Sequence, residues 1–195
     1  MNAVLGTINP APSRVVSAAH PPILVSKLVL EDAGVIADGQ IVALDSDSLL
    51  IAHQEVADVD MTGMIDGTNK DFAATLDPAP VLPGSVQIDN NNTAPQVIVD
   101  DGHGRLVGGG SGTVNYKTGE VAVTFTTAPA AGKTVKIGHK TQPVGASVNA
   151  CDTGADDTAL VIRHGAVNRD LILTGSLAAD AEDIAALEAI GIFAV

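Results

Sequence analysis

The stretch Val114-Asn115-Tyr116-Lys117-Thr118-Gly119-Glu120-Val121-Ala122-Val123-Thr124-Phe125 decides the fold class of this chain. Its second half alternates apolar Val121, Val123 and Phe125 with smaller or polar residues, which is the two-residue period of a strand with one apolar face. The Lys-Thr-Gly connection before it supplies a glycine where a tight turn needs one. The stretch therefore predicts a β-hairpin, and similar short apolar runs separated by turn residues recur along most of the chain.

The composition favours the same fold class. The 195 residues include 20 glycines and 10 prolines, and 46% are hydrophobic although only 2% are aromatic. The interior must therefore be built from Ala, Val, Ile and Leu, and the frequent turns favour many short strands over long helices. This length suits one medium domain or two small ones. We expect a mainly β protein.

The charge balance excludes several classes of partner. The chain has 23 acidic and 10 basic residues, for a formal net charge of −13. Phosphate contacts need clustered Lys and Arg, so we expect no nucleic-acid partner and no binding to anionic membranes.

No apolar run reaches the roughly 18 residues of a membrane helix, and the N-terminus lacks the features of a signal peptide. The single Cys151 gives no internal disulfide. We expect a soluble protein made in a cytoplasm.

The N-terminal segment differs from the rest in charge and in proline content. No acidic residue precedes Glu31, and Pro10 and Pro12 interrupt the first twenty residues. Proline removes a hydrogen-bond donor and discourages helix. We predict an extended arm over residues 1–20 that buries little surface by itself and is mobile in solution.

The residue pattern and charge of the remaining chain indicate a discontinuous domain and an insertion. Residues 21–62 form the first part of that domain, and residues 23–54 within them show short β-branched runs separated by turns, which predicts a meander of antiparallel strands. Residues 63–140 carry six of the ten basic side chains and seven of the 23 acidic ones, together with several hairpin signals. We predict that they form an inserted β-sandwich domain of immunoglobulin-like type. Residues 141–195 then complete the first domain.

One helix is predicted near the C-terminus. Asp180 is a good N-cap, and Asp183 stands at the third helical position, where a carboxylate favours the positive end of the helix. Apolar residues at 184, 187 and 190 share one face, and Gly191 suits the left-handed C-terminal cap. Residues 192–195 then predict a short final strand.

Catalytic and metal-binding motifs are incomplete throughout. Ser111 lies in a glycine-rich stretch that lacks the second glycine of a nucleophile elbow. The run Asp58-Val59-Asp60-Met61-Thr62-Gly63 imitates the start of a calcium loop, but Asn69 stands where that loop needs a bidentate Glu. The five histidines are scattered, with no pair at metal-ligand spacing. We predict no enzyme, no metal site and no cofactor.

The chain resembles one known family in part of its length. Residues 143–146, 159–169 and 184–192, with the run 38–44 earlier, are similar to the lambda-type bacteriophage head decoration proteins. The resemblance implies a capsid-stabilising virion protein that trimerises at threefold positions on the outside of the expanded head. It also implies that the N-terminal arm pairs with the major capsid protein. Residues 80–86 and 112–121 resemble a β-sandwich module that recurs in phage structural proteins.

The resemblance and the arm together suggest candidate contact residues. An arm without carboxylates can approach a strand edge of the capsid protein without burying negative charge. The candidate capsid contacts are Leu5, Ile8, Pro10, Val15 and Val16. The candidate trimer seam, assigned only by position in the family, consists of Ile162, His164, Val167 and Ile172.

Other interpretations remain open from the sequence. Residues 63–140 could act as an adhesin-like module for a host glycan or surface component, although carbohydrate sites usually need a stacking ring and aromatic residues are scarce. His164 could instead be a structural histidine with hydrogen-bond partners in its own subunit. The chain could also be a two-domain β protein of another role.

Overall fold

The computed structural model describes residues 15–17, 21–61 and 63–195, and it is mainly β with one α-helix among those residues. Seven strands form the first sheet. Its order is β1-β16-β14-β4-β5, and β2 and β19 also pair with β16. These strands are β1 (Val16–Ser17), β2 (Ile23–Leu28), β4 (Ile41–Leu44), β5 (Leu50–Ala52), β14 (Pro143–Ser147), β16 (Thr158–Val167) and β19 (Ile192–Ala194).

The central strands β16 and β4 of the first sheet have buried side chains on both faces. Successive side chains of a strand point to opposite faces, so Val161 and Ile162 enter two different core clusters. Val42 and Ile41 of β4 divide between the same two clusters. A strand that is buried on both faces has apolar residues at consecutive positions, which explains the continuous apolar run at residues 159–162.

Each face of the first sheet has its own cover. On one face lies α1 (Ala181–Ala189), whose Ile184 and Leu187 enter the core cluster of Ile162. On the other face lies the two-stranded ribbon of β3 (Val35–Ile36) and β15 (Cys151–Asp152). A 3-10 helix (Arg169–Leu171) and the hairpin of β17 (Leu173–Thr174) and β18 (Leu177–Ala178) connect β16 to α1.

The predicted C-terminal helix is confirmed together with both of its caps. The Asp180 carboxylate accepts a hydrogen bond of 2.8 Å from the backbone N–H of Asp183. Gly191 has a φ of +89°, the left-handed conformation that ends the helix, and the chain continues directly into β19. The final strand is also confirmed, and it runs parallel to β16.

Eight strands form the second sheet, in the order β6-β13-β8-β9-β10-β11-β12-β7, and they curl into a nearly closed barrel. The strands are β6 (Glu55–Asp60), β7 (Asp71–Thr75), β8 (Gln87–Asp89), β9 (Val97–Asp100), β10 (Arg105–Gly108), β11 (Gly110–Val114), β12 (Glu120–Phe125) and β13 (Lys136–Lys140). One core cluster fills the interior, with Phe72 and Phe125 in an edge-to-face contact. The strands form one continuous hydrogen-bonded sheet, where the sequence predicted a sandwich of two.

The hairpin predicted over residues 114–125 is confirmed in place and register. Val114 of β11 lies opposite Val121 of β12, and the backbone N–H of Gly119 donates to the carbonyl of Asn115 at 2.8 Å. The alternation of β12 buries Val121, Val123 and Phe125 in the barrel core.

Two details of the predicted organisation need correction. The second sheet starts at Glu55, because β6 pairs with β13, whereas the sequence placed the start at residue 63. The predicted meander over residues 23–54 is also broken, because β2 pairs with β16 and not with β4. Within this described range only the β4–β5 hairpin is local. Strand pairing between segments more than a hundred residues apart overrides the local order here.

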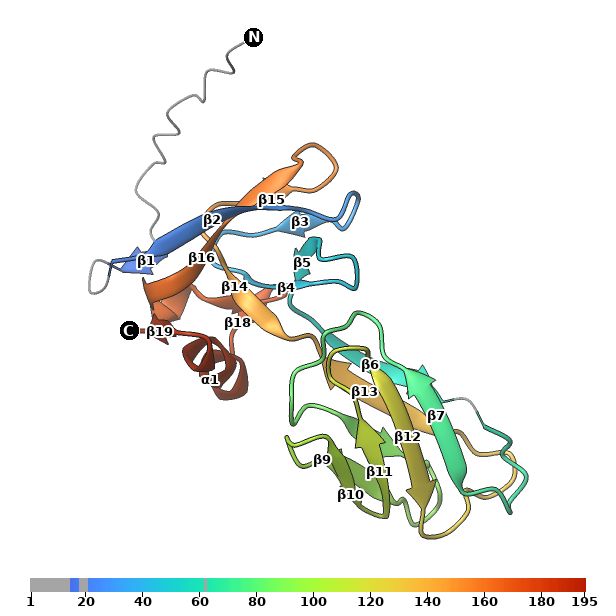
Figure 1. Ribbon diagram of the computed structural model, residues 1–195. Coiled ribbons are helices and arrows are strands. Elements are labelled where there is room, and N and C mark those ends of the chain that lie inside the picture. Colours follow the sequence, from blue (N-terminus) through green and yellow to red (C-terminus); the bar gives the residue numbers. More distant parts are fainter. Residues whose placement is uncertain (1–14, 18–20, 62) are drawn as a thin grey trace.

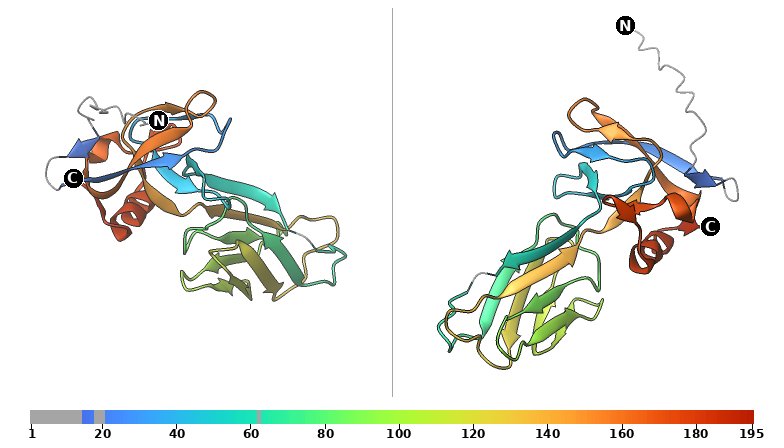
Figure 2. Two further views of the ribbon diagram at one scale, coloured as in Figure 1. Left: turned by 45° about the horizontal axis from the view of Figure 1, so that its top comes forward. Right: turned by 180° about the vertical axis from the view of Figure 1, so that it is seen from behind.

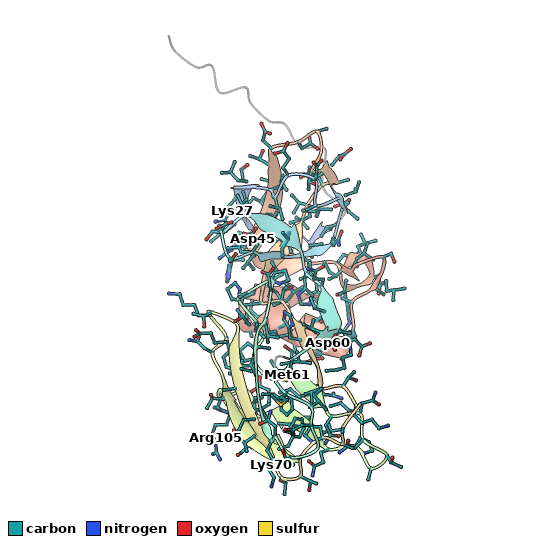
Figure 3. The ribbon with its side chains drawn as sticks, turned by 90° about the vertical axis from the view of Figure 1, so that its right-hand side faces the viewer. Lys27, Asp45, Asp60, Met61, Lys70 and Arg105 are labelled. Atoms are coloured by element: carbon teal, nitrogen blue, oxygen red, sulfur yellow. The ribbon has the colours of Figure 1, made fainter. Side chains whose placement is uncertain are left out.

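The two sheets belong to two units that lie end to end (Figure 1). We call residues 15–17, 21–54 and 141–195 the first unit, and residues 55–61 and 63–140 the second unit. The turned views in Figure 2 show the same separation. In Figure 3, Lys27 lies in the first unit, and Lys70 and Arg105 lie toward the far end of the second unit.

Candidate functional site

The predicted capsid contacts divide between described and undescribed residues. Leu5, Ile8 and Pro10 lie outside the residues that the structure describes. Val15 is only 1% exposed and belongs to the core of the first unit, and its carbonyl accepts a hydrogen bond from Asn168. Val16 is half-buried and pairs with Val167. The last part of the predicted arm is therefore a strand of the first unit, and Val15 is unavailable as a capsid contact.

Most of the predicted trimer seam is wrong. Ile162, Val167 and Ile172 have 0% exposure and lie in one core cluster of their own chain. Their side chains cannot reach another subunit, because β16 is the central strand of a sheet with a core on each face. A short apolar run looks alike in a buried strand and in an interface, so the sequence could not separate the two.

His164 differs from the other three seam candidates because it is half-buried. It follows an irregularity in the pairing with β2 and lies opposite Ile23, which is 55% exposed. Its ring meets the ring of Phe193 edge to face, with centroids 6.4 Å apart, and Phe193 is 44% exposed. A Cβ at Gly191 would lie 2.7 Å from the His164 Nδ1, so the glycine leaves room for the imidazole. This corner of the sheet can form an apolar contact.

The first sheet has an open edge beside this corner. β1 and β2 follow each other along the same side of β16, while β14 and β19 occupy its other side. Among the described residues no strand pairs with the outer side of β2. Ile23, Leu24 and Leu28 of β2 are exposed large apolar residues. An unpaired edge offers backbone N–H and C=O groups to an added strand.

A buried polar cluster lies between the two units, and the sequence analysis missed it. The carboxylate of Asp183 accepts from the Thr174 hydroxyl at 2.6 Å and contacts the Lys140 Nζ at 3.0 Å. The Nε2 of His53 lies 3.3 Å from the same carboxylate, and its Nδ1 lies 3.0 Å from the Thr141 Oγ1. The sequence marked only Asp183, as a carboxylate at the third helical position that favours the positive end of the helix.

Burial and hydrogen bonding shift the pKa values of His53 and Asp183 in this cluster. Burial lowers the pKa of His53 below its ordinary value, although Asp183 opposes the shift. Burial alone would raise the pKa of Asp183, but hydrogen bonds from Thr174 and Lys140 outweigh it and hold that pKa below its usual range. The order threonine, histidine, aspartate imitates a catalytic triad. However, Thr141, His53 and Asp183 are 0%, 1% and 2% exposed, so the cluster is closed to substrate.

A shallow polar groove of about 380 Å³ runs along the outer face of β13 beside this cluster. Gly138 forms part of its floor, and Lys136 and Lys140 lie among its lining residues. Both lysines are already paired, Lys136 with Asp60 at 2.7 Å and Lys140 with three carboxylates of the helix start. The surplus of acidic side chains around it gives the groove a negative character.

The remaining sequence candidates lie apart. Ser111 is in β11, and Asp58 and Asp60 are part of strand β6, so the calcium-like run does not form a loop. Cys151 is buried, and burial raises the pKa of its thiol. Across the described ranges, no three His, Cys, Asp or Glu side chains are grouped to hold a metal. No helix within them has the length and apolar character to cross a membrane.

Comparison with protein-family models, with curated proteins and with solved structures gives no match to this chain.

Proposed function

We propose that this chain is a bacteriophage head decoration protein that binds the outer surface of the expanded capsid as a trimer and stabilises it. The N-terminal segment adds to the major capsid protein, the first unit lies on the shell, and the second unit projects from it. The observation that carries the proposal is the open edge of the first sheet, to which the N-terminal segment leads directly through β1.

The architecture of the first unit supports this function. The segments that resemble decoration proteins include β4, β14, β16 and the α1–β19 unit. β4 precedes the second unit in the sequence and pairs with β14, which follows it, and β14 and β19 both pair with β16, so these segments form one structure. We expect this arrangement if the first unit has the fold of the decoration proteins and the second unit is an insertion into it. The two units lie end to end, so the far end of the first unit points away from the second (Figure 1).

The trimer contact in this proposal lies at the corner of His164, Ile23 and Phe193. The two apolar side chains are exposed there, and none of the three residues carries a carboxylate. Copies that each carry a net charge of −13 repel one another, so they can associate best through surfaces free of negative side chains.

The adhesin alternative has less support in the second unit. Phe72 and Phe125 are 3% and 1% exposed, so neither ring is available to stack on a sugar. Tyr116 is half-buried, and its hydroxyl is engaged with Asp100. Binding of the full chain to a glycan array through the second unit would favour that alternative.

The experiment is a co-sedimentation assay with expanded heads that lack this protein, using the full chain and two double variants. Leu5→Ala with Ile8→Ala removes two apolar contacts, and Asn2→Ala with Asn9→Ala changes the same segment without removing apolar surface. We expect the first pair to weaken binding by on the order of 100-fold, because each side chain contributes roughly 1.5 kcal/mol or more when buried. The asparagine pair should bind within about threefold of the parent chain.

Electron microscopy of decorated heads then tests the position. Density for three copies around threefold sites supports the proposal. Undiminished binding of the leucine–isoleucine variant, or the absence of this chain from the outside of the head, rejects it.

A further inference from the structure

The two units are connected by a narrow ribbon of two chain crossings. One crossing runs from β5 to β6 and the other from β13 to β14. They are hydrogen-bonded to each other where the backbone N–H of Thr141 donates to the carbonyl of Gln54 at 3.1 Å. An isolated two-stranded ribbon is only marginally stable and can twist. The relative orientation of the units therefore depends on the side chains that brace this ribbon.

The first brace connects the end of β13 to the start of α1. The Lys140 Nζ contacts Asp180 at 3.3 Å, Glu182 at 3.0 Å and Asp183 at 3.0 Å. His53, which lies in the other crossing, contacts the same Asp183 carboxylate. One buried carboxylate thus holds both crossings to the helix.

The second brace is the loop of residues 77–82 on the other unit. The backbone N–H of Gln142 donates to the carbonyl of Pro80, and that of Leu82 donates to the carbonyl of Lys140, both at 2.8 Å. His139 is 1% exposed and holds this loop through its Nε2, which lies 3.2 Å from the Pro78 carbonyl oxygen. A carbonyl can only accept, so Nε2 is the protonated nitrogen. The other nitrogen, Nδ1, is buried without a hydrogen-bond partner.

We propose that the ribbon is an acid-sensitive joint, closed while His53 and His139 are neutral and loosened when they take up protons. A proton on the His139 Nδ1 would create a buried N–H with no acceptor, and a charge in a site built for a neutral ring. A proton on His53 would place a second cation beside Lys140, with the Asp183 carboxylate shared between them.

The charged groups around the two histidines decide how the joint responds to pH. His53 faces the carboxylate of Asp183 from α1 and the ammonium of Lys140 from β13, and the charge that acts on His139 is the carboxylate of Asp77, next to Pro78. Burial lowers the pKa of both histidines below their ordinary value of 6.5, and these carboxylates only partly oppose the shift.

The sign of the pH dependence follows from these shifts. A depressed pKa in the closed state means that the open state binds protons first. Closure is therefore fully favoured above pH 6.5 and is weakened progressively as the pH falls from there to the lowered pKa values. The pKa of Asp183 is also held low, so the contact between Lys140 and Asp183 persists through this window. The joint therefore loosens before the first brace loses its ion pair.

The experiment measures backbone ¹⁵N relaxation of the full chain at about pH 7.5 and about pH 5, on either side of the ordinary histidine pKa. We expect one rotational correlation time for both units at the higher pH and two different, shorter ones at the lower pH. In the double variant His53→Gln with His139→Gln the amides cannot titrate, so a single correlation time should persist at both pH values. The matched control is His103→Gln, because His103 is exposed in the β9–β10 turn, and it should behave as the parent chain.

Two results would overturn the proposal: relaxation of the parent chain that does not change with pH, or a double variant that responds to pH as the parent chain does. Should the double variant fail to fold, the ring-proton titrations of His53 and His139 in the parent chain decide instead. Titration of both below 6.5, together with the change in relaxation, supports the acid-sensitive joint. Titration of either one at or above 6.5 contradicts it.

Discussion

At the scale of single residues, Tyr116 shows how one side chain can hold several turns together. Its hydroxyl donates to the Asp100 carboxylate at 2.6 Å and accepts from the backbone N–H of Gly104 at 2.7 Å. The same carboxylate accepts from the backbone N–H of Gly84 at 2.6 Å and of Gly102 at 3.0 Å. Burial, followed by the hydrogen bond to Asp100, raises the pKa of Tyr116 to about 12.

An alkaline titration tests this arrangement cleanly, because Tyr116 is the single tyrosine and the chain has no tryptophan. We expect the ultraviolet absorbance of the phenolate to appear with a midpoint near pH 12 in the folded protein and near 10 in urea. Since the folded pKa is the higher one, the contribution of Tyr116 to stability is complete below pH 10 and is lost as the pH rises toward 12. The control is Tyr116→Phe, which has no phenol and should show no such change in absorbance. A folded-state midpoint near 10 would show that the hydroxyl is free.

The partners in the polar contacts at the joint could not be predicted from the sequence alone. The sequence predicts Asp183 as a carboxylate at the third helical position, because that signal lies within four residues of the N-cap Asp180. Its partner His53 is 130 residues away, and His53 contacts Thr141 across 88 residues. No local periodicity relates such positions. The pairing exists because the chain leaves the first sheet after β5 and returns at β14, a property of the topology.

At the scale of elements, two glycines of the hairpin turns share a left-handed backbone conformation but differ in the space available for a side chain. Gly119 and Gly102 have φ values of +73° and +77°. A Cβ at Gly119 would lie 2.3 Å from the backbone oxygen of Leu76, whereas a Cβ at Gly102 would meet nothing within 4 Å. Replacement by alanine therefore strains both turns but causes a clash in only one of them.

We expect Gly102→Ala to lower the free energy of unfolding by on the order of 1 kcal/mol, the cost of a left-handed non-glycine residue. Gly119→Ala should cost at least about 1 kcal/mol more, because the β11–β12 hairpin must shift away from β7. Urea unfolding followed by the fluorescence of Tyr116 measures both. Equal losses in the two variants would mean that the hairpin moves freely against β7.

Elements with local signals are also the ones that sequence analysis predicts well. The β11–β12 hairpin and the capped helix α1 each carry their turn or cap residues within the segment, and both are confirmed. The apolar run in β16 carries no such signal, and it was interpreted as a trimer seam although it is the centre of the first sheet. Whether an apolar face meets its own chain or another one depends on what packs against it, and that is decided by α1 and the β3–β15 ribbon.

At the scale of the whole molecule, the two units have separate hydrophobic cores. One cluster fills the barrel of the second unit and includes Phe72, and a different cluster under α1 includes Leu187. The hydrogen bonds and ion pairs between the units are concentrated at the joint. A core that is shared by all parts makes unfolding cooperative, whereas separate cores allow each unit to unfold by itself. The residue pattern and charge of the sequence already indicated two domains, although they placed the start of the second one eight residues too late, at residue 63 instead of Glu55.

Differential scanning calorimetry of the full chain should therefore resolve two transitions. Phe72→Ala should cost the second unit about 3–5 kcal/mol, and Leu187→Ala should cost the first unit about 2–5 kcal/mol. For units of this size each kcal/mol lowers the melting temperature by roughly 4–8 °C, so each variant should move one transition far below the other. The two variants serve as controls for each other, since each leaves the other core intact. If both variants instead shift a single common transition, the polar joint couples the two cores tightly enough to make them one cooperative unit.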